Sequence, residues 1–315
     1  MHMKFLFFIL SLLLAEHVFS QKKKSVAFYN VENLFDTINQ ANLDEEFLPS
    51  AEKGWNTAKY TEKLIHIRQV MDHLQYPLIV GFAEVENKGV LLDLIKDKKM
   101  KRYGIVHYDS EDARGIDVGL LYNKKYLKVL SSRFIRFPLP NNPESKTRDI
   151  LYVLLESKTD KFHVLVNHWP SRRGGTEQSE PKRLTAANTA LHCIDSIQKI
   201  NPQAKIIFMG DLNDTPKDKS AQSIAERLVP MITEKSGTHH GSHQYRGNWD
   251  ILDHILVSSP CFEGKHAVQK ESGKIQEFDF LLETYKGNIQ PFRTYVGKKY
   301  LGGYSDHLPV SVDLK

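Results

Sequence analysis

Short runs of β-branched and aromatic residues alternate along this chain with segments whose apolar residues recur at helical spacing. The predicted strands are Ser25–Tyr29, Leu78–Ala83, Asp117–Tyr122, Ile150–Leu155, His163–Val166, Lys205–Met209, Ile251–Val257 and Val310–Leu314. Predicted helices begin at Thr57 and after Asn87, and a third runs from Pro181 to Ile200, each with its apolar residues on one face. Alternation of this kind predicts a layered α/β protein.

The segments between these elements show where loops and domain boundaries are expected. Predicted loops, rich in Pro, Gly, Ser, Asn and charge, are Arg133–Thr147, Ser171–Glu180 and Pro216–Gln244, the last with a short helix near Ser220–Leu228. No long low-complexity stretch interrupts residues 25–315, and 315 residues with 41% hydrophobic side chains can bury a sizeable core. We expect one domain over residues 21–315, or two tightly joined halves.

The first 20 residues differ from the rest of the chain. Lys4 provides a positive start, Phe5–Ala15 is apolar, and Val18-Phe19-Ser20 resembles a signal-peptidase site. An apolar stretch of about eleven residues is too short to span a bilayer as a helix. Residues 1–20 are therefore predicted to be a cleavable signal peptide, with a buried N-terminal helix as the alternative. We expect a secreted or periplasmic protein without stable membrane association.

Charge and cysteine content add weaker constraints. The formal net charge of +5 suits a polyanionic substrate, although many inert surfaces carry a similar charge. The two cysteines, Cys193 and Cys261, lack a zinc-binding spacing. A disulfide and two isolated buried thiols are both compatible with the sequence.

Polar side chains follow one predicted strand directly. The apolar run that ends at Met209 is followed by Gly210, Asp211, Leu212 and Asn213. Asp211 and Asn213 are two residues apart in an extended segment, so their side chains face the same way. An acid and an amide so placed can contact an attacking water and orient a phosphate.

Two other predicted strands also end at polar residues. Asn30 follows Ser25–Tyr29, and Glu84 follows Leu78–Ala83, so the two side chains can meet at one sheet edge. Taken singly, each is more often a turn or capping residue, and Glu86 and Asn87 are candidates for starting the next helix.

Basic residues and histidines occur in two further strings. Arg114 and Asp117 precede one predicted strand, while Asn167, His168 and Arg172 follow another. His168 is a candidate to protonate a leaving oxygen, and Arg114 or Arg172 is a candidate to bind a phosphate. A lone histidine at a strand end is more often structural.

The C-terminal third supplies a second histidine and two acids. Asp253 lies in a predicted strand, where it can orient an imidazole and stabilise its positive form. Ser305-Asp306-His307 supplies that imidazole together with one more acid for a metal.

Taken together, these strings resemble a known superfamily. N-V-x-N-L, G-F-x-E-V-E-N, R-G-I-D-V, V-N-H-W-P-S-R, G-D-L-N-D, L-D-H-I and S-D-H-L-P-V occur in the order typical of the endonuclease/exonuclease/phosphatase superfamily, the deoxyribonuclease I-like hydrolases. The resemblance extends from about Ser25 to Leu314. It implies a four-layered α/β sandwich, in which two packed mixed β-sheets are flanked by helices.

The resemblance also implies roles for individual residues. Asn30, Glu84 and Asp306 match the metal site, Asp211 and Asn213 its acid and amide pair, Asp253 and His307 its orienting acid and terminal histidine, and His168 the second histidine of secreted members. Asp117 is assigned as the partner of His168 from its position alone. Two departures, Tyr29 in place of Trp and Ala83 in place of Gln, remove no reacting group.

The expected chemistry is hydrolysis of a phosphoric ester with Mg²⁺, or with Mn²⁺ or Ca²⁺, bound by Glu84, Asp306 and Asn30. His307 or Asp211 would take the proton from water, and the sequence leaves this choice open. Asn213 and Asn167 would donate to the phosphate, and His168, kept protonated by Asp117, would assist the leaving group.

Three kinds of function remain compatible with these residues. A secreted monomeric nuclease, most simply an endonuclease on DNA or RNA, is the first. A phosphatase or a sphingomyelinase-like phospholipid phosphodiesterase is the second. A catalytically silent binding protein on the same scaffold is the third, and it is disfavoured because all expected reacting groups are present.

Overall fold

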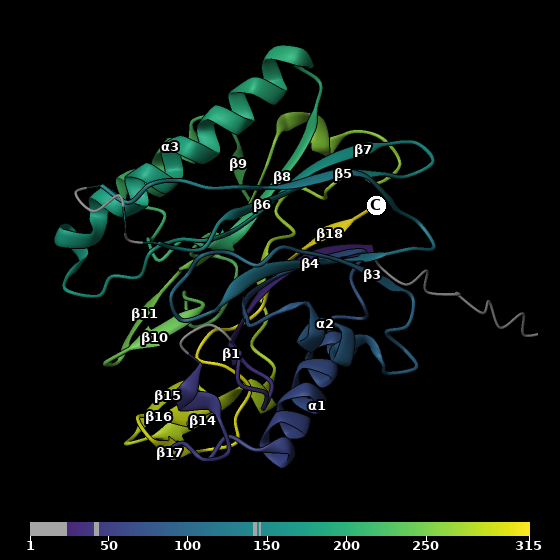
Figure 1. Cartoon of the computed structure of the whole chain (residues 1–315). Helices are drawn as coiled ribbons and strands as arrows, with labels where there is room; N and C mark the ends of the chain where they lie inside the picture. The colour runs from purple at the N-terminus through teal and green to yellow at the C-terminus, as the bar shows by residue number, and fades with distance from the viewer. Residues whose placement is uncertain (1–23, 41–43, 141–143, 145) are drawn as a thin grey trace, which may run out of the picture.

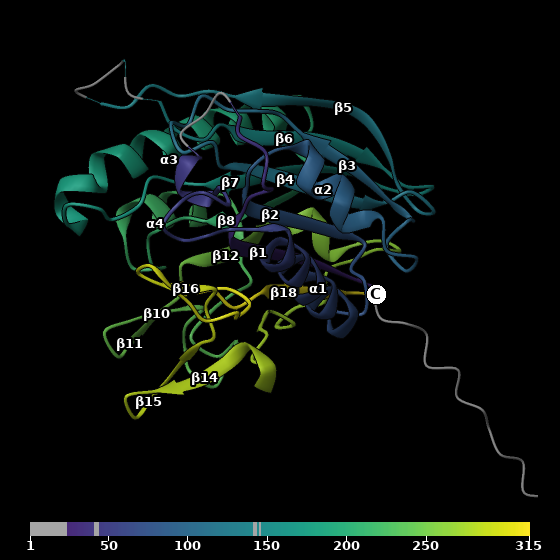
Figure 2. The same ribbon diagram turned by 60° about the horizontal axis from the view of Figure 1, so that its bottom comes forward.

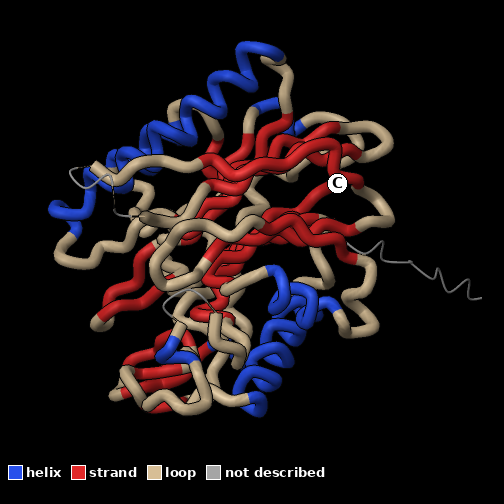
Figure 3. Tube along the Cα trace, in the orientation of Figure 1, coloured by secondary structure: helices blue, strands red, loops and turns tan. Residues whose placement is uncertain are grey.

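The computed structural model describes residues 24–40, 44–140, 144 and 146–315 (Figure 1). The predicted signal peptide lies outside the described residues. Two six-stranded sheets pack face to face, with α1 and α2 covering the outer face of one sheet and α3 covering the outer face of the other (Figures 1 and 3). The predicted four-layered α/β sandwich is confirmed.

The first sheet contains the N-terminal and C-terminal strands of the described chain. Its order is β13 (Lys274–Ile275), β18 (Val310–Leu314), β1 (Lys24–Leu34), β2 (Ile79–Val85), β4 (Asp117–Asn123) and β3 (Tyr103–His107). Only β1 and β2 run parallel, and the other neighbours are antiparallel.

The second sheet has the same mixed character. Its order is β5 (Lys128–Ile135), β6 (Ile150–Glu156), β7 (Lys161–His168), β8 (Lys205–Asp211), β12 (Asp253–Val257) and β9 (Val229–Pro230). Here β7 and β8 are the parallel pair. β5 was not predicted, because as an edge strand it is mostly exposed and lacks a continuous apolar run.

The helices are α1 (Thr57–His73), α2 (Lys88–Ile95), α3 (Thr176–Ile200) and α4 (Lys219–Ala225), and the short 3₁₀ turns are η1 (Glu45–Phe47), η2 (Ser259–Phe262) and η3 (Asp279–Leu281). Side chains at the preceding residues cap the first two helices: Asn56 accepts from the Lys59 N–H, and Asn87 accepts from the Val90 N–H.

Helix α3 begins five residues before the predicted start, so the predicted loop Ser171–Glu180 is wrong in its second half. Pro181 therefore lies inside the helix rather than at its beginning. The first turn is stabilised by side chains that the sequence pattern did not indicate: Ser179 Oγ donates to the Gly175 carbonyl, and Arg183 donates to the Thr176 carbonyl.

In the part of the chain that the structure describes, three two-stranded hairpins extend beyond the sheets. They are β10 (His243–Tyr245) with β11 (Asn248–Asp250), β14 (Leu282–Tyr285) with β15 (Asn288–Pro291), and β16 (Tyr295–Val296) with β17 (Lys299–Tyr300). Figure 2 shows β10–β11 and β14–β15 projecting from the same side of the molecule.

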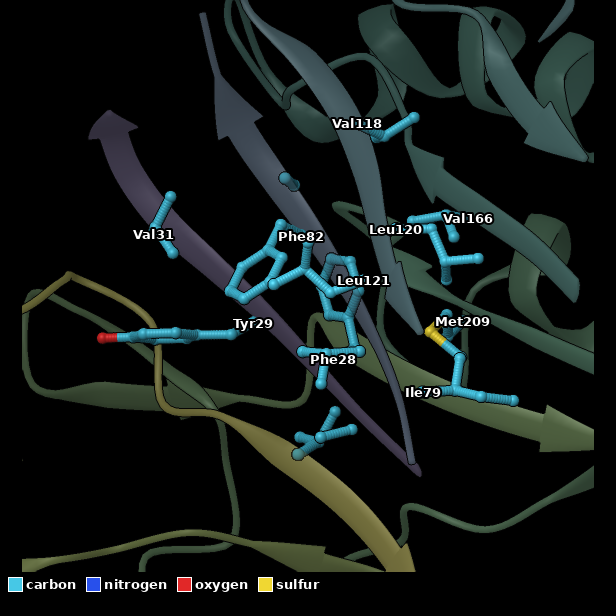
Figure 4. Packing of buried hydrophobic residues seen from close by; sticks show 14 of the residues in the cluster. Phe28, Tyr29, Val31, Ile79, Phe82, Val118, Leu120, Leu121, Val166 and Met209 are labelled. Atoms are coloured by element: carbon cyan, nitrogen blue, oxygen red, sulfur yellow. The ribbon is translucent and has the colours of Figure 1, made fainter. Parts of the chain in front are cut away.

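The core between the sheets is close-packed. Phe28 of β1, Val166 of β7 and Met209 of β8 are fully buried and point into this interface (Figure 4). They converge on Gly81 of β2, where an added Cβ would lie 2.6 Å from the Met209 sulfur and 3.1 Å from Val166. A side chain at position 81 would therefore require the Met209 side chain to shift and the neighbouring side chains to give way by a few tenths of an ångström.

A second hydrophobic cluster lies between α3 and the second sheet. The helix presents Ala186, Ala187 and Ala190 to the sheet, which allows a close approach to Leu165 and Phe208. Cys193 belongs to this cluster and Cys261 to the core between the sheets. Both are buried free thiols, so the structure shows the unpaired alternative.

Glu86, between β2 and α2, is buried without a cationic partner in the described structure, and its Oε2 accepts from the Asp36 N–H at 2.7 Å. Burial, together with the carboxylates of Asp36 and Asp44, raises the pKa of Glu86 to about 8. The folded state therefore binds more protons than the unfolded state between pH 4.5 and about 8. The free energy of unfolding should fall as pH rises through this window.

The Glu86→Gln variant stays uncharged and should escape this penalty. At pH 8.5, in the presence of EDTA, its free energy of unfolding should exceed that of the wild-type chain by at least about 1.4 kcal/mol, the equivalent of one pKa unit. Near pH 4.5 the two should be equal. Urea unfolding at both pH values checks this, and equal stability at pH 8.5 would contradict it.

None of the helices in the described ranges combines the length and the apolar character needed to cross a bilayer.

Candidate active site

Polar residues from both sheets meet where the two parallel strand pairs end. Asn30 and Glu84 lie near the ends of β1 and β2, and His168 and Asp211 are the last residues of β7 and β8. Asn30 Nδ2 donates to Glu84 Oε1 at 3.3 Å and to Asp211 Oδ2 at 3.1 Å. Asn30 therefore connects the two sheets at this edge.

The backbone at this edge is locally irregular. Glu84 has a φ of 62° and lies where the pairing of β2 with β4 shifts register, and Asn213 has a φ of 50°. Non-glycine residues in the left-handed region are uncommon and concentrate at functional sites. The bulge at Glu84 directs its carboxylate toward Asn30 and the Asn33 N–H rather than along the regular strand.

A chain of ionisable groups crosses the second sheet. Asp253, the first residue of β12, is fully buried, and its Oδ2 accepts from His307 Nδ1 at 2.7 Å. The same oxygen accepts from Ser242 Oγ at 2.6 Å. His307 Nε2 then faces Asp211 Oδ2 at 3.7 Å. Asp253 thus fixes which ring nitrogen of His307 is directed at Asp211.

Burial and mutual charge shift the proton affinities of this chain. Burial opposes the charged form of His307, but the carboxylates of Asp253 and Asp211 outweigh it and raise its pKa well above the ordinary value. Burial, with Asp253 adding to it and His307 opposing, raises the pKa of Asp211 to about 7. The pair can therefore share a proton near neutral pH, as a general base requires.

His168 joins the same cluster from the neighbouring strand. Its Nε2 lies 3.6 Å from Asp211 Oδ2 and 3.8 Å from Glu84 Oε1. Burial, and then the positive charges of Arg148 and Arg114, lower the pKa of His168 well below its ordinary value. His168 is therefore neutral in this structure at physiological pH.

The expected pairing of Asp117 with His168 is not formed. Asp117 Oδ1 accepts from the Ser110 N–H at 2.9 Å, and its Oδ2 faces His107 Nε2 at 3.5 Å. His168 Nδ1 has no hydrogen-bond partner among the described residues. The expectation rested on position along the chain, and the β3–β4 pairing instead places His107 beside Asp117.

The phosphate-binding candidates Asn213, Asn167 and Arg114 differ in burial and in hydrogen-bond partners. Asn213 Nδ2 donates to the Trp169 carbonyl, and Asn167, which is fully buried, donates to the Met209 carbonyl and accepts from the Trp169 indole. The side-chain amide of Asn167 is therefore engaged in hydrogen bonds to Met209 and Trp169 within the protein. Arg114 is half exposed, and its Nε lies 3.8 Å from Asp112.

Arg172 connects the loops around the site. It donates to the Asn213 carbonyl at 2.7 Å, to Asp218 at 2.9 Å and to Asp250 at 3.3 Å. A phosphate contact would require its guanidinium to leave these partners, so in this structure Arg172 orders the loops that follow β8 and β11.

Asp306 lies in an ion cluster that the sequence did not reveal. Arg293 donates to Asp306 Oδ2 at 2.8 Å and to Glu32 Oε1 at 3.3 Å. Burial, with Asp306 adding to it, raises the pKa of Glu32 to about 7. Burial opposes ionisation of Asp306, but Arg293 and His307 outweigh it and lower its pKa. Arg293 lies in a loop without a motif, so no sequence signal identified it.

His243 of β10 is another residue that the sequence reasoning missed. Its ring centroid lies 4.7 Å from that of His307, and the two backbones form an isolated β-bridge. Burial, and then the charge on His307, lowers the pKa of His243 to about 4. His243 occurs within a stretch predicted to be a loop, where a lone histidine carries no pattern.

The donors present fit a hard divalent cation. Asn30 donates to Glu84 in one part of the site, and Asp306, which accepts from Arg293, has an oxygen near His307 and His243 in another. Ligand atoms of Asp306, His307 and His243 lie within 4.8 Å of one another, as do those of Asp211, Asp253 and His307. Mg²⁺ usually takes only one or two carboxylates from a protein and keeps several waters, so these donors suit it.

Similar architectures occur in solved structures. The human Nocturnin catalytic domain with bound sulfate anion is 18% identical, with a TM-score of 0.59 and coverage of 93% of this chain and 94% of that chain. D. rerio TDP2 complexed with single-strand DNA product is 15% identical, with a TM-score of 0.57 and coverage of 93% and 99%. An endonuclease/exonuclease/phosphatase family protein from Bacteroides thetaiotaomicron is 14% identical, with a TM-score of 0.57 and coverage of 93% and 97%. No curated protein matches the sequence.

At these identities the structural likeness establishes the fold alone. The family assignment comes from the sequence itself, because a model of the Endonuclease/Exonuclease/phosphatase family matches residues 25–315. The match spans the two sheets and every strand end described above, and the chain therefore belongs to the endonuclease/exonuclease/phosphatase family.

Proposed function

We propose that this protein is an exported, Mg²⁺-dependent phosphodiesterase that cleaves nucleic acid. The observation that carries the proposal is the contact chain Asp253–His307–Asp211, which ends beside Asn30 and Glu84. It places a group able to accept a proton near neutral pH next to the candidate metal ligands.

In the proposed reaction Glu84, Asp306 and Asn30 would bind the cation. When bound, the cation supplies charge neutralisation at a phosphate oxygen. Asp211 or His307 accepts the proton of the attacking water, and Asp253 keeps His307 Nε2 directed into the site. Asn213 turns its amide from the Trp169 carbonyl to a phosphate oxygen. His168, being neutral, acts as a hydrogen-bond donor from Nε2 rather than as an imidazolium.

Nucleic acid is the proposed substrate class for two reasons. The chain has a formal net charge of +5, and the β10–β11 hairpin presents an exposed tip in which Arg246 lies over the ring of Tyr245 at 5.2 Å. That hairpin begins at His243, beside His307, so its tip extends outward from the candidate site. An exposed aromatic ring with an adjacent cation suits a base and its phosphate.

Single-stranded DNA binding should therefore weaken with salt. Between about 50 and about 200 mM KCl the affinity should fall at least about tenfold if three or more phosphates are contacted. The Arg246→Ala variant should bind more weakly and show a shallower salt slope. Fluorescence anisotropy in EDTA measures both quantities without cleavage.

Lys286→Ala provides a matched control, because Lys286 occupies the tip of the other hairpin with a similar contact to Tyr285. Its DNA affinity and salt slope should equal those of the wild-type chain. An unchanged slope for Arg246→Ala would exclude the β10–β11 tip from substrate binding.

Incubation of the purified chain with supercoiled plasmid, linear duplex and RNA, with and without Mg²⁺, tests the activity itself. Magnesium-dependent nicking of the closed circle would establish endonucleolytic cleavage. Absence of cleavage of all three, by a chain shown to be folded, would refute the proposed nuclease.

A phospholipid phosphodiesterase is the second candidate, and the β14–β15 hairpin favours it. Tyr285 and Ile289 on this hairpin are 43% and 46% exposed, with Lys286 at the turn. Exposed apolar residues beside a cation suit a lipid surface. Magnesium-dependent release of phosphocholine from sphingomyelin vesicles, in place of plasmid nicking, would select this alternative.

Export is proposed from the pattern of residues 1–20. Expression of the whole chain in a secreting bacterial host, followed by mass spectrometry of its N-terminus, tests it. Recovery of a chain that begins at Gln21 is expected, and recovery only of a chain that begins at Met1 would contradict export.

A further inference from the structure

The carboxylate of Asp117, expected at the active site, instead belongs to a separate cluster at the ends of β3 and β4. His107 Nε2 lies 3.5 Å from Asp117 Oδ2, and His107 Nδ1 lies 3.7 Å from Asp109 Oδ1. One ligand atom from each of the three residues can be chosen so that all lie within 4.8 Å of one another. Here we call these three residues the His107 cluster.

The imidazole of His107 is the unusual member of this cluster. Its side chain is only 1% exposed, and its Nε2 is buried without a hydrogen-bond partner in the described structure. Buried polar atoms normally have a partner, and an unpaired one costs about 1–3 kcal/mol. His107 Nε2 faces Asp117 Oδ2 at 3.5 Å without forming a hydrogen bond. Its lone pair or proton is therefore not satisfied by a hydrogen bond within the described residues.

A cavity of about 560 Å³ adjoins the cluster and is lined by Asp109 and Asp117. Three further acids line it: Glu86, Glu111 and Asp112. Two of these are paired with cations, since Glu111 contacts Arg136 and Lys146, and Asp112 contacts Arg148. Among the described residues, no cation other than His107 pairs with Asp109 or Asp117, so these two carboxylates leave negative charge on one side of the cavity.

Glu86 lines the same cavity, but burial and the carboxylates of Asp36 and Asp44 raise its pKa to about 8, so it adds no charge at neutral pH. The carboxylates of the cavity that can bind a cation beside an imidazole are therefore those of Asp109 and Asp117, both members of the His107 cluster. A cation in this region would compensate charge that the protein itself leaves unbalanced.

The types of ligand atom in the His107 cluster narrow the choice of cation. An imidazole with two carboxylates suits borderline divalent ions such as Zn²⁺ and Mn²⁺, whereas Ca²⁺ takes oxygen ligands in larger number. Zn²⁺ binds histidine nitrogen and carboxylate oxygen at about 2.0–2.2 Å, and one ring nitrogen of His107 lies within 4.8 Å of an oxygen of each carboxylate. The remaining position would be open to the cavity and to water.

We propose that His107, Asp109 and Asp117 form a second divalent-metal site, selective for Zn²⁺-like ions and separate from the candidate active site. The site joins β3 to β4 and closes the loop between them. That loop carries Asp112, which accepts from Arg148 Nη1 at 3.1 Å, and Arg148 Nη2 donates to the Trp169 carbonyl at 2.8 Å, one residue beyond His168. Metal binding would therefore order a loop that contacts the edge of the active site.

Zinc titration of the purified full chain by calorimetry tests the site. In an Asp306→Asn background, which weakens the candidate active-site metal position, one Zn²⁺ should bind with an affinity that falls at least tenfold when His107→Asn is added. Asp109→Asn, a change at an 82% exposed side chain, should lower the affinity similarly without impairing folding. His192→Asn, an exposed histidine on α3, is the matched control and should leave binding unchanged.

Thermal unfolding provides an independent measurement. Zn²⁺ at about one hundred times its Kd should raise the Tm of the Asp306→Asn chain by about 5 °C, and this shift should disappear when Asp109→Asn is added. Equal Zn²⁺ affinity and an equal Tm shift in the Asp306→Asn chain with and without Asp109→Asn would overturn the proposal. Because neither readout involves catalysis, the result is independent of whether the chain cleaves nucleic acid.

Discussion

The His307→Ala variant is expected to lower kcat for phosphodiester cleavage by at least about 10²-fold, the low end of what a positioned acid–base group contributes. His307 is held by Asp253 at 2.7 Å and faces Asp211 at 3.7 Å, so its removal disrupts the proton-accepting pair whichever member is the base. Asp211→Asn should cause a loss of similar size. Steady-state cleavage of the preferred nucleic acid in Mg²⁺ measures both.

The control for this experiment is His192→Ala on the exposed face of α3, which should keep wild-type activity. Circular dichroism should show that all variants are folded. Full activity in either His307→Ala or Asp211→Asn would remove that residue from the reaction. Asp253→Asn should also lower kcat, because an amide at position 253 can favour the wrong tautomer of His307.

The Arg183→Met variant is expected to lower the free energy of unfolding by about 3 kcal/mol, since it leaves a buried carboxylate without its closest cation. Arg183 and Asp214 are both fully buried, and Arg183 Nε lies 2.6 Å from Asp214 Oδ1. Arg172, 3.7 Å from the same oxygen, remains and keeps the expected loss at the lower end of the range. Urea unfolding of the purified variants measures the change.

Two matched variants separate charge burial from lost packing. The double variant Arg183→Met/Asp214→Asn removes the uncompensated charge while keeping an acceptor for Ser220, so it should recover at least half of the lost stability. Lys182→Met, at the exposed neighbouring position, should stay within about 0.5 kcal/mol of the wild-type chain. An Arg183→Met variant as stable as the wild-type chain would show that the ion pair makes no net contribution to the free energy of unfolding.

Patterns of short range determined much of the fold. Apolar runs with strand period and helices with one apolar face indicated an α/β protein, and ordered motifs indicated its family, because both signals are carried by residues adjacent in sequence. Among the longer sheet strands, β3 and β5 were not predicted, because half-buried positions in β3 and exposed positions in β5 interrupt the apolar pattern. The predicted start of α3 was also wrong, because Ser179 and Arg183 stabilise a first turn that helix propensity alone disfavours.

Residue types in the candidate site were also readable from the sequence where a strand ends in an acid, an amide or a histidine. Asn30, Glu84, His168 and Asp211 were selected this way, whereas Asp253 was selected at a predicted strand and His307 from the string Ser305-Asp306-His307. The structure brings all six to one edge of the sandwich. Their convergence follows from two parallel strand pairs that end on the same side.

Tertiary structure alone decided the partners of these residues. Arg293 contacts Asp306 and Glu32, the latter from 261 residues away, and Asp117 faces His107 instead of His168 because β3 pairs with β4. Such contacts depend on which side chains the packing of distant strands and loops leaves within a few ångströms of each other. Periodicity and local motifs show which face of a helix or strand a residue occupies. They do not show which residue of another element lies opposite it, because that pairing is fixed only when the whole sandwich is packed.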